Sequence, residues 1–95
     1  MNKSPDSPPL IEARIKLNFV FHDAFELYKK REKDYGNSWT RCEVSFLLKR
    51  LLGEIDEANY LIQAEAQDWD YTRLHDELLD VINVAAMLAA RLDKK

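Results

Sequence analysis

The stretch LLGEIDEA, Leu51 to Ala58, sets three acids inside an apolar helical pattern, and HDELLDVI, His75 to Ile82, repeats the theme further along the chain. Each stretch lies in a longer run whose apolar residues recur every three or four positions, which is the period of an α-helix. They are Val44, Leu47, Leu48, Leu51, Ile55, Ala58 and Ile62 in the first run, and Leu74, Leu78, Val81, Ile82, Ala85, Leu88, Ala89 and Leu92 in the second. The spacing predicts two helices, each with acids beside its apolar stripe.

The sequence ahead of these runs predicts another helix, from about Pro8 to about Asp34. Ser7 can cap it, and Pro8 suits the first turn because its missing N–H would be unsatisfied there anyway. Its apolar residues form two stripes, which indicates two packing partners: Leu10, Leu17, Phe21, Ala24 and Tyr28, and separately Ile11, Ile15 and Phe19. Residues 1–9, rich in Ser, Pro and Asp, are expected to be a flexible tail, and residues 10–95 a single domain.

Turn signals separate the three predicted helices. Gly36 interrupts the helical pattern within DYGNSWT. The helix that follows is expected to begin with a capping box. In that box the side chains of Thr40 and Glu43 each bond to the other residue's backbone N–H. This helix should end near Ala66, and Asp70 is the expected N-cap of the last helix.

The last helix also carries apolar residues away from its stripe, namely Leu79, Val84, Ala86 and Met87. A helix that is apolar on most sides is buried on most sides. A chain of 95 residues has too little surface to cover such a helix alone. The predicted fold is therefore an all-α antiparallel helical bundle of about three helices per chain, completed by oligomerisation to a homodimer or homotetramer.

Composition narrows the class of protein. The chain is 46% hydrophobic and 33% charged, as in soluble globular proteins, and its net charge of −3 argues against binding a nucleic-acid polymer or mimicking one. The single cysteine, Cys42, excludes an intrachain disulfide and a cysteine-based zinc site, and it favours a reducing cytoplasm. We find no signal peptide, and the longest mostly apolar run, Val81 to Ala90, is too short to cross a bilayer. We expect a cytoplasmic protein without a membrane partner.

The two acidic motifs hold matched positions on their helices. At about 100° per residue, Glu54 and Glu57 lie beside their apolar stripe at the same angles as Glu77 and Asp80 beside theirs. In an antiparallel hairpin both pairs flank one groove, where two carboxylates about 6 Å apart repel by about 3 kcal/mol at an effective dielectric constant of 20. A divalent cation such as Mg²⁺ reverses the sign of this energy, because it prefers oxygen ligands and bridges carboxylates to phosphates.

The order ExxE at 54–57 and ExxD at 77–80, within LLGEIDEA and DELLDVINVAAMLA, resembles the MazG-like all-α nucleotide pyrophosphohydrolases. The segment KDYGNSW is similar to a turn in some phage and prokaryotic members, although Gly53 stands where many members carry a further glutamate. The resemblance covers roughly residues 32–92 and would make residues 10–95 one MazG-like helical domain.

The resemblance implies a function. Members hydrolyse a nucleoside triphosphate between its α and β phosphates, giving monophosphate and pyrophosphate, as nucleotide-pool house-cleaning enzymes that form dimers or tetramers. Carried onto this chain, Glu54, Glu57, Glu77 and Asp80 would be the catalytic Mg²⁺ ligands. Water held by the metal would be the nucleophile, deprotonated by the acid that is least tied to the metal.

Four further residues are candidates for contact with the nucleotide. Lys33 could meet phosphate oxygens, although cations near a helix C-terminus are also favoured by the helix dipole. Tyr35 and Trp39 could stack on a base, but for Trp39 a hydrophobic staple with Val44 is the favoured interpretation. Asn83, in an otherwise apolar helix, could bond a substrate or cross an oligomer interface.

The sequence also allows two alternatives to an enzymatic function. The acids could form a solvated helix edge, because Arg50 and Arg73 each lie four residues before the first acid of a pair and could neutralise it. The chain could also be a non-catalytic helical interaction module, because its apolar residues exceed the needs of one small core.

Overall fold

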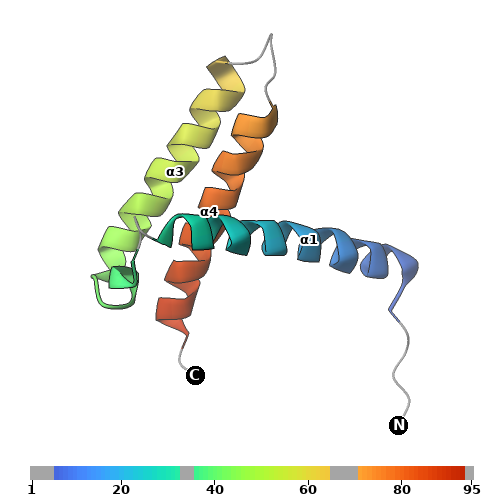
Figure 1. Ribbon diagram of the computed structural model, residues 1–95, viewed down its shortest axis with the longest axis horizontal. Helices are drawn as coiled ribbons and strands as arrows, with labels where there is room; N and C mark the ends of the chain where they lie inside the picture. The colour runs from blue at the N-terminus through green and yellow to red at the C-terminus, as the bar shows by residue number, and fades with distance from the viewer. Residues whose placement is uncertain (1–5, 33–35, 65–70, 94–95) are drawn as a thin grey trace.

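The computed structural model describes residues 6–32, 36–64 and 71–93. They form three α-helices and one short 3-10 helix, and these described ranges contain no strand. The elements, shown in Figure 1, are α1 (Pro8–Lys30), η1 (Ser38–Thr40), α3 (Val44–Ala64) and α4 (Tyr71–Leu92). The predicted all-α class and the three α-helices are confirmed.

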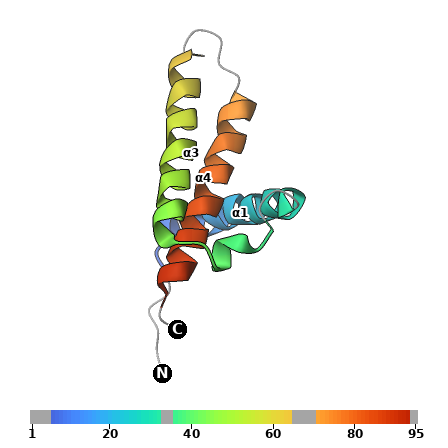
Figure 2. The ribbon, with the colours of Figure 1, turned by 90° about the vertical axis from the view of Figure 1, so that its left-hand side faces the viewer.

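The helices α3 and α4 lie side by side as an antiparallel hairpin (Figures 1 and 2). Helix α1 does not run along this hairpin. It crosses α4 near its own C-terminal end, and its N-terminal half projects beyond the hairpin (Figure 1). Within one chain the three helices are therefore a hairpin with a crossing helix, and α4 is the element that contacts both others.

The N-terminus of α1 follows the sequence. The Ser7 hydroxyl accepts a hydrogen bond from the Leu10 N–H at 3.3 Å, and the helix begins at Pro8, so both predictions are confirmed. Pro8 and Pro9 thus belong to the helix rather than to the tail, of which residues 1–5 lie outside the described part. The helix ends at Lys30 rather than near Asp34, because Arg31 leaves the helical region with φ −95° and ψ 8°.

The start of α3 contradicts the predicted capping box. The helix begins at Val44, whereas Thr40 lies in η1 and its hydroxyl donates to the Asn37 carbonyl at 2.6 Å. The Thr40 side chain is thus bonded within its own turn. Thr40 is therefore not the N-cap on which the predicted staple of Trp39 on Val44 depended. Helix α3 is described as far as Ala64. The predictions at residues 66 and 70 lie outside the described part.

The core is small and centred on α4. Its buried apolar side chains are Ala24 from α1, Leu47, Ala58 and Leu61 from α3, and Leu79, Val84 and Met87 from α4. The predicted stripes are therefore partly wrong, since several of their members are exposed: Leu48, Ile55, Ile62, Leu78 and Leu92. On α4 the buried apolar residues, Leu79, Val84 and Met87, lie off the predicted stripe, whereas Ala86, also off the stripe, is exposed.

Helix α1 leaves most of its apolar residues exposed. Only Ala24 is buried among its described residues, and the exposed ones are Leu10, Ile11, Ile15, Leu17, Phe19, Phe21 and Phe25. No helix in the described part of the chain is both long enough and apolar enough to cross a membrane. The exposed apolar residues of α1 form an apolar surface along this helix.

Candidate functional site

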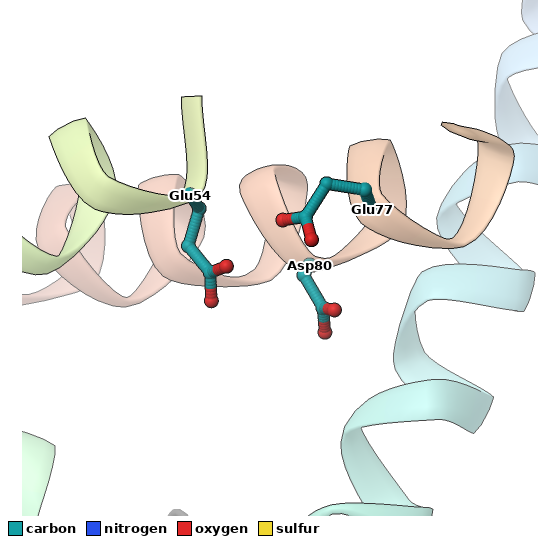
Figure 3. Close-up of side chains that lie close together, drawn as sticks. All are labelled: Glu54, Glu77 and Asp80. Atoms are coloured by element: carbon teal, nitrogen blue, oxygen red, sulfur yellow. The ribbon is translucent and has the colours of Figure 1, made fainter. Parts of the chain in front are cut away.

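Three of the predicted acids meet where α3 and α4 face each other. Glu54 comes from α3, and Glu77 and Asp80 come from α4 (Figure 3). One carboxylate oxygen from each residue lies within 4.8 Å of the others. The antiparallel hairpin produces this cluster, because it sets the ExxE motif opposite ExxD, and residues three apart on α4 share a face. We call these three residues the acidic cluster.

The fourth predicted acid lies outside the acidic cluster. Glu57 is one turn beyond Glu54, about 60° further round α3 and away from the hairpin contact. It is exposed, and it borders a hollow of about 340 Å³ together with Gly53, Asp56 and Tyr60. Its charge still reaches the cluster, because it is among the charges that raise the pKa of Glu77.

The pKa of Glu77 is strongly raised in this site. Burial, a side-chain hydrogen bond with Glu54 and the charges of Glu54, Asp80 and Glu57 raise the pKa of Glu77 to about 8. Its Oε2 atom is buried and has no hydrogen-bond partner among the described residues. Near neutral pH the side chain is therefore largely protonated, which removes one of the charges that would repel one another.

Asp80 has a cationic neighbour that the sequence did not reveal. Arg31, at the end of α1, places its Nε atom 3.0 Å from Oδ1 of Asp80, whose side chain is only 10% exposed. The only signal in the sequence was a group of cations at a helix C-terminus, which the helix dipole already explains. Nothing in the spacing of residues 31 and 80 indicates that α1 crosses α4 at this level.

Two predicted nucleotide-contacting residues lie on one pocket, and two lie outside the described residues. Trp39 and Asn83 line a pocket of about 310 Å³ between α1, η1 and α4, together with Phe25, Tyr28, Ala86, Met87 and Ala90. Asn83 is 8% exposed and its Nδ2 donates to the Ala24 carbonyl at 2.8 Å. Asn83 thus ties α4 to α1 within the chain. Lys33 and Tyr35 fall in the undescribed segment 33–35.

The aromatic wall of this pocket is held by polar contacts. The Phe25 and Tyr28 rings stack with centroids 5.9 Å apart, and the Trp39 indole N–H donates to the Tyr28 hydroxyl at 3.0 Å. Arg91 of α4 donates to the backbone carbonyls of Trp39, at 2.9 Å, and Cys42. Sequence reasoning missed Phe25, Tyr28 and Arg91, although the spacing of the two aromatic residues, three apart, could have shown that they share a face.

The acidic cluster fits a hard divalent cation. Its donor set consists of carboxylate oxygens, which Mg²⁺ prefers, and it includes one buried oxygen without a partner among the described residues. Carboxylates so close to one another repel unless protons or cations intervene. Burial is the largest cause of the raised pKa of Glu77, and this repulsion adds to it. A cation at this position would satisfy the unpaired oxygen and relieve the repulsion together.

In comparisons with known proteins, the chain matches no family model, no curated protein and no solved structure.

Proposed function

We propose that the protein is a Mg²⁺-dependent hydrolase that converts a nucleoside or deoxynucleoside triphosphate to monophosphate and pyrophosphate, clearing non-standard or excess nucleotides in the cytoplasm. The observation that carries this proposal is the convergence of Glu54, Glu77 and Asp80, from two helices, on one point. The resemblance of the two acidic motifs to those of MazG-like pyrophosphohydrolases supports the same reaction.

Each acid has a role in this proposal. Glu54, Glu77 and Asp80 would hold Mg²⁺, which when bound neutralises charge on the phosphates and activates water. Glu57 lies outside the acidic cluster and is exposed, so its carboxylate remains available to accept a proton from the attacking water. Glu57 is therefore the proposed general base, and it also remains a predicted metal ligand should the cation draw it inward.

The pocket around Trp39 is the proposed place for the nucleoside. Asn83 lies three residues after Asp80, about 4.5 Å further along the axis of α4, so the pocket adjoins the acidic cluster. A planar base suits its aromatic wall, because offset stacking on aromatic rings is favourable. Lys33 and Tyr35 remain predicted contacts of the nucleotide.

The test is a screen for pyrophosphate release from a panel of nucleoside triphosphates with Mg²⁺. Glu54→Gln should abolish Mg²⁺-dependent release, and Glu57→Gln should lower kcat by about a hundredfold, as expected for loss of a general base. Asp76→Asn is the matched control, since this exposed acid is next to Glu77 on α4 and lies outside the acidic cluster. Its activity should equal that of the wild type.

Other results would contradict the proposed enzymatic function. Absence of pyrophosphate release across the panel, in a folded protein that binds no Mg²⁺ at millimolar concentration, would refute it. Equal losses in Glu54→Gln and Asp76→Asn would show that the effect is one of surface charge rather than of the acidic cluster.

The exposed apolar side chains favour a second candidate, a helical interaction module. Seven large or medium apolar residues of α1 alone are exposed, and further ones lie on α3. We propose that a second copy of the chain covers part of this surface in a homodimer or homotetramer, which is compatible with the enzyme. If a different protein covers it instead, the purified chain should aggregate alone and gain thermal stability when that partner is added.

A further inference from the structure

Arg31 connects the end of α1 to the acidic cluster. It is the first residue beyond the helix, and its Nε atom lies 3.0 Å from Oδ1 of Asp80. The Asp80 side chain is 10% exposed, whereas that of Arg31 is 41% exposed. The guanidinium therefore reaches an almost buried carboxylate while part of it stays in contact with solvent.

The contact between Arg31 and Asp80 lacks the geometry in which arginine binds a carboxylate most strongly. That arrangement uses two parallel N–H donors aimed at the two carboxylate oxygens. Here the Nε atom is buried and makes no aligned hydrogen bond to the described residues, although Oδ1 lies close to it. The pair is held by opposite charge and proximity, so its geometry does not fix the guanidinium in place.

A cation on the acidic cluster and the guanidinium compete for the same carboxylate. Asp80 supplies one of the three oxygens that lie within 4.8 Å of one another, and a divalent ion among them would be close to the positive charge on Arg31. Two positive centres a few ångströms apart repel, most strongly where solvent is largely excluded. Binding the divalent ion therefore weakens the hold of Asp80 on Arg31.

We propose that Arg31 holds the place of the cation on Asp80 and, once a divalent cation has bound, turns to bind the phosphate oxygens of the nucleotide. This rests on the proposed function. The planar fork of a guanidinium matches two phosphate oxygens, and the exposed part of the side chain leaves it room to turn. Arg31 is thus a phosphate-binding residue with two partners, Asp80 in the free protein and phosphate in the complex.

A purely structural role makes the opposite prediction about cation affinity. If Arg31 only ties α1 to α4, removing it loosens the fold around Asp80, and cation binding stays the same or weakens. If Arg31 competes with the cation, removing it strengthens cation binding. The sign of the change therefore separates the two roles.

The experiment measures Mg²⁺ and Mn²⁺ affinity by calorimetric titration of the whole chain without nucleotide. Arg31→Gln should bind either ion roughly fivefold to tenfold more tightly than the wild type, because one nearby positive charge is gone. Lys30→Gln is the matched control, since it removes a neighbouring exposed charge that no contact joins to Asp80. Its affinity should stay within about twofold of the wild type, as expected for a screened surface charge.

A second variant tests the phosphate role. Arg31→Lys keeps the charge and loses the fork, so its cation affinity should stay near that of the wild type. With the cation present, it should bind a non-hydrolysable nucleoside triphosphate more weakly than the wild type does. Arg31→Gln should also bind that nucleotide more weakly, despite its tighter cation site.

A measurement on the wild type covers the case in which Arg31→Gln does not fold. The Arg31 Nε–H resonance, assigned by its absence in Arg31→Lys, should move when Mg²⁺ is added and move again with the triphosphate analogue. A resonance that responds to neither addition overturns the proposal, as does Arg31→Gln affinity equal to or weaker than that of the wild type.

The outcomes separate this inference from the proposed function. A wild type that binds no cation refutes both. A wild type that binds the cation but releases no pyrophosphate refutes only the reaction, and the change of cation affinity in Arg31→Gln still decides the competition. A wild type that releases pyrophosphate, with no gain of cation affinity in Arg31→Gln, refutes only the inference about Arg31.

Discussion

The carboxyl group of Glu77 links the chemistry of the site to the stability of the fold. Its pKa is raised from 4.5 to about 8, first by burial and then by Glu54 and the other neighbouring acids. The folded protein therefore binds this proton more tightly than the unfolded chain does. By linkage, the stability that comes from this group is fully present below pH 4.5 and is lost as the pH rises through about 8.

Replacing Glu77 with glutamine should remove this pH dependence, because the amide is a neutral isostere of the protonated acid. Near about pH 5 the wild type and Glu77→Gln should unfold at similar temperatures, whereas near about pH 9 the variant should be the more stable of the two. Thermal unfolding followed by circular dichroism across this range measures the difference. Curves that stay parallel over the whole range would show that the wild-type carboxyl is already ionised at about pH 5.

The three members of the acidic cluster are among the four acids predicted from sequence, because helical spacing indicates which acids share a face. Glu54, Glu77 and Asp80 follow from two helical phases and one antiparallel hairpin. Arg31 could not be predicted, because its contact depends on where α1 crosses α4, and local spacing does not encode a crossing point. Glu57 was predicted to belong to the same group but lies outside it, although Asp80, at the same three-residue step from Glu77, lies inside. Spacing does not show which residue of such a pair faces the other helix.

At the scale of elements, the crossing of α1 over α4 depends on one small residue. Ala24 is 2% exposed, and its carbonyl accepts the hydrogen bond from buried Asn83. A small side chain lets the two backbones approach closely enough for that bond. The position of α1 also sets the Arg31 contact with Asp80 and the aromatic wall of the pocket.

Enlarging Ala24 should therefore separate α1 from α4. Ala24→Leu should destabilise the protein by about 1–3 kcal/mol through overpacking, measured by urea unfolding. It should also expose Trp39 to solvent, which its fluorescence in a Trp69→Phe background reports. Ala13→Leu, in the projecting half of the same helix, is the control and should change stability by less than about 0.5 kcal/mol. Equal effects from both substitutions would mean that α1 does not dock through Ala24.

The helices themselves were predictable, whereas their caps and faces were predictable only in part. The period of the apolar residues predicted α3 and α4, and Ser7 and Pro8 predicted where α1 begins. The predicted capping box is not formed, because the Thr40 hydroxyl donates to a carbonyl of its own turn. A local sequence pattern does not show which of two nearby backbone groups a side chain will bond to. The buried side of α4 was misplaced because periodicity shows that a helix is apolar on several sides and does not show which neighbour covers each.

At the scale of the whole molecule, the chain is open. Its radius of gyration is 16.3 Å, whereas a compact domain of about 100 residues has about 13 Å. Its accessible surface is 7622 Å², and a compact monomer of this mass exposes about 5,700 Å². The difference, about 1,900 Å² for one chain, exceeds the roughly 800 Å² that each partner buries in an interface of standard size and is in the range of larger, obligate interfaces. A second copy of the chain would bury surface of this size.

One exposed stripe has the spacing of a helix–helix seam. Along α3, the positions 48, 52, 55, 59 and 62 alternate steps of four and three, which is the repeat of packed helix pairs. Leu48, Leu52, Ile55 and Ile62 on this stripe are 42–54% exposed, and they lie on a different side of the helix from the residues that face α4. We call this stripe the α3 seam.

Charges beside the α3 seam favour an antiparallel partner. Lys49 and Asp56 lie seven residues apart on the same flank of the seam, about two turns of helix. In an antiparallel pair of α3 helices, Lys49 of each copy would face Asp56 of the other. A parallel pair would set these charges against apolar positions. The pairing is therefore expected to be antiparallel, centred between Leu52 and Ile55.

The last prediction tests this pairing. Ile55→Lys places a charge at the centre of the α3 seam, where burying it without a partner is costly, so the variant should be a monomer. The wild type should be a dimer or a larger assembly built from it, as measured by sedimentation equilibrium. Phe46→Lys is the matched control, because Phe46 is 59% exposed on α3 but lies off the seam, so this variant should keep the wild-type mass.

Because α3 also carries Glu54, the monomeric variant further shows whether cation binding needs the partner. The acidic cluster is complete within one chain, so Mg²⁺ affinity should survive dissociation. A wild type that sediments as a monomer, or an Ile55→Lys variant that keeps the wild-type mass, would show that the seam is not the contact and that the exposed surface serves another partner.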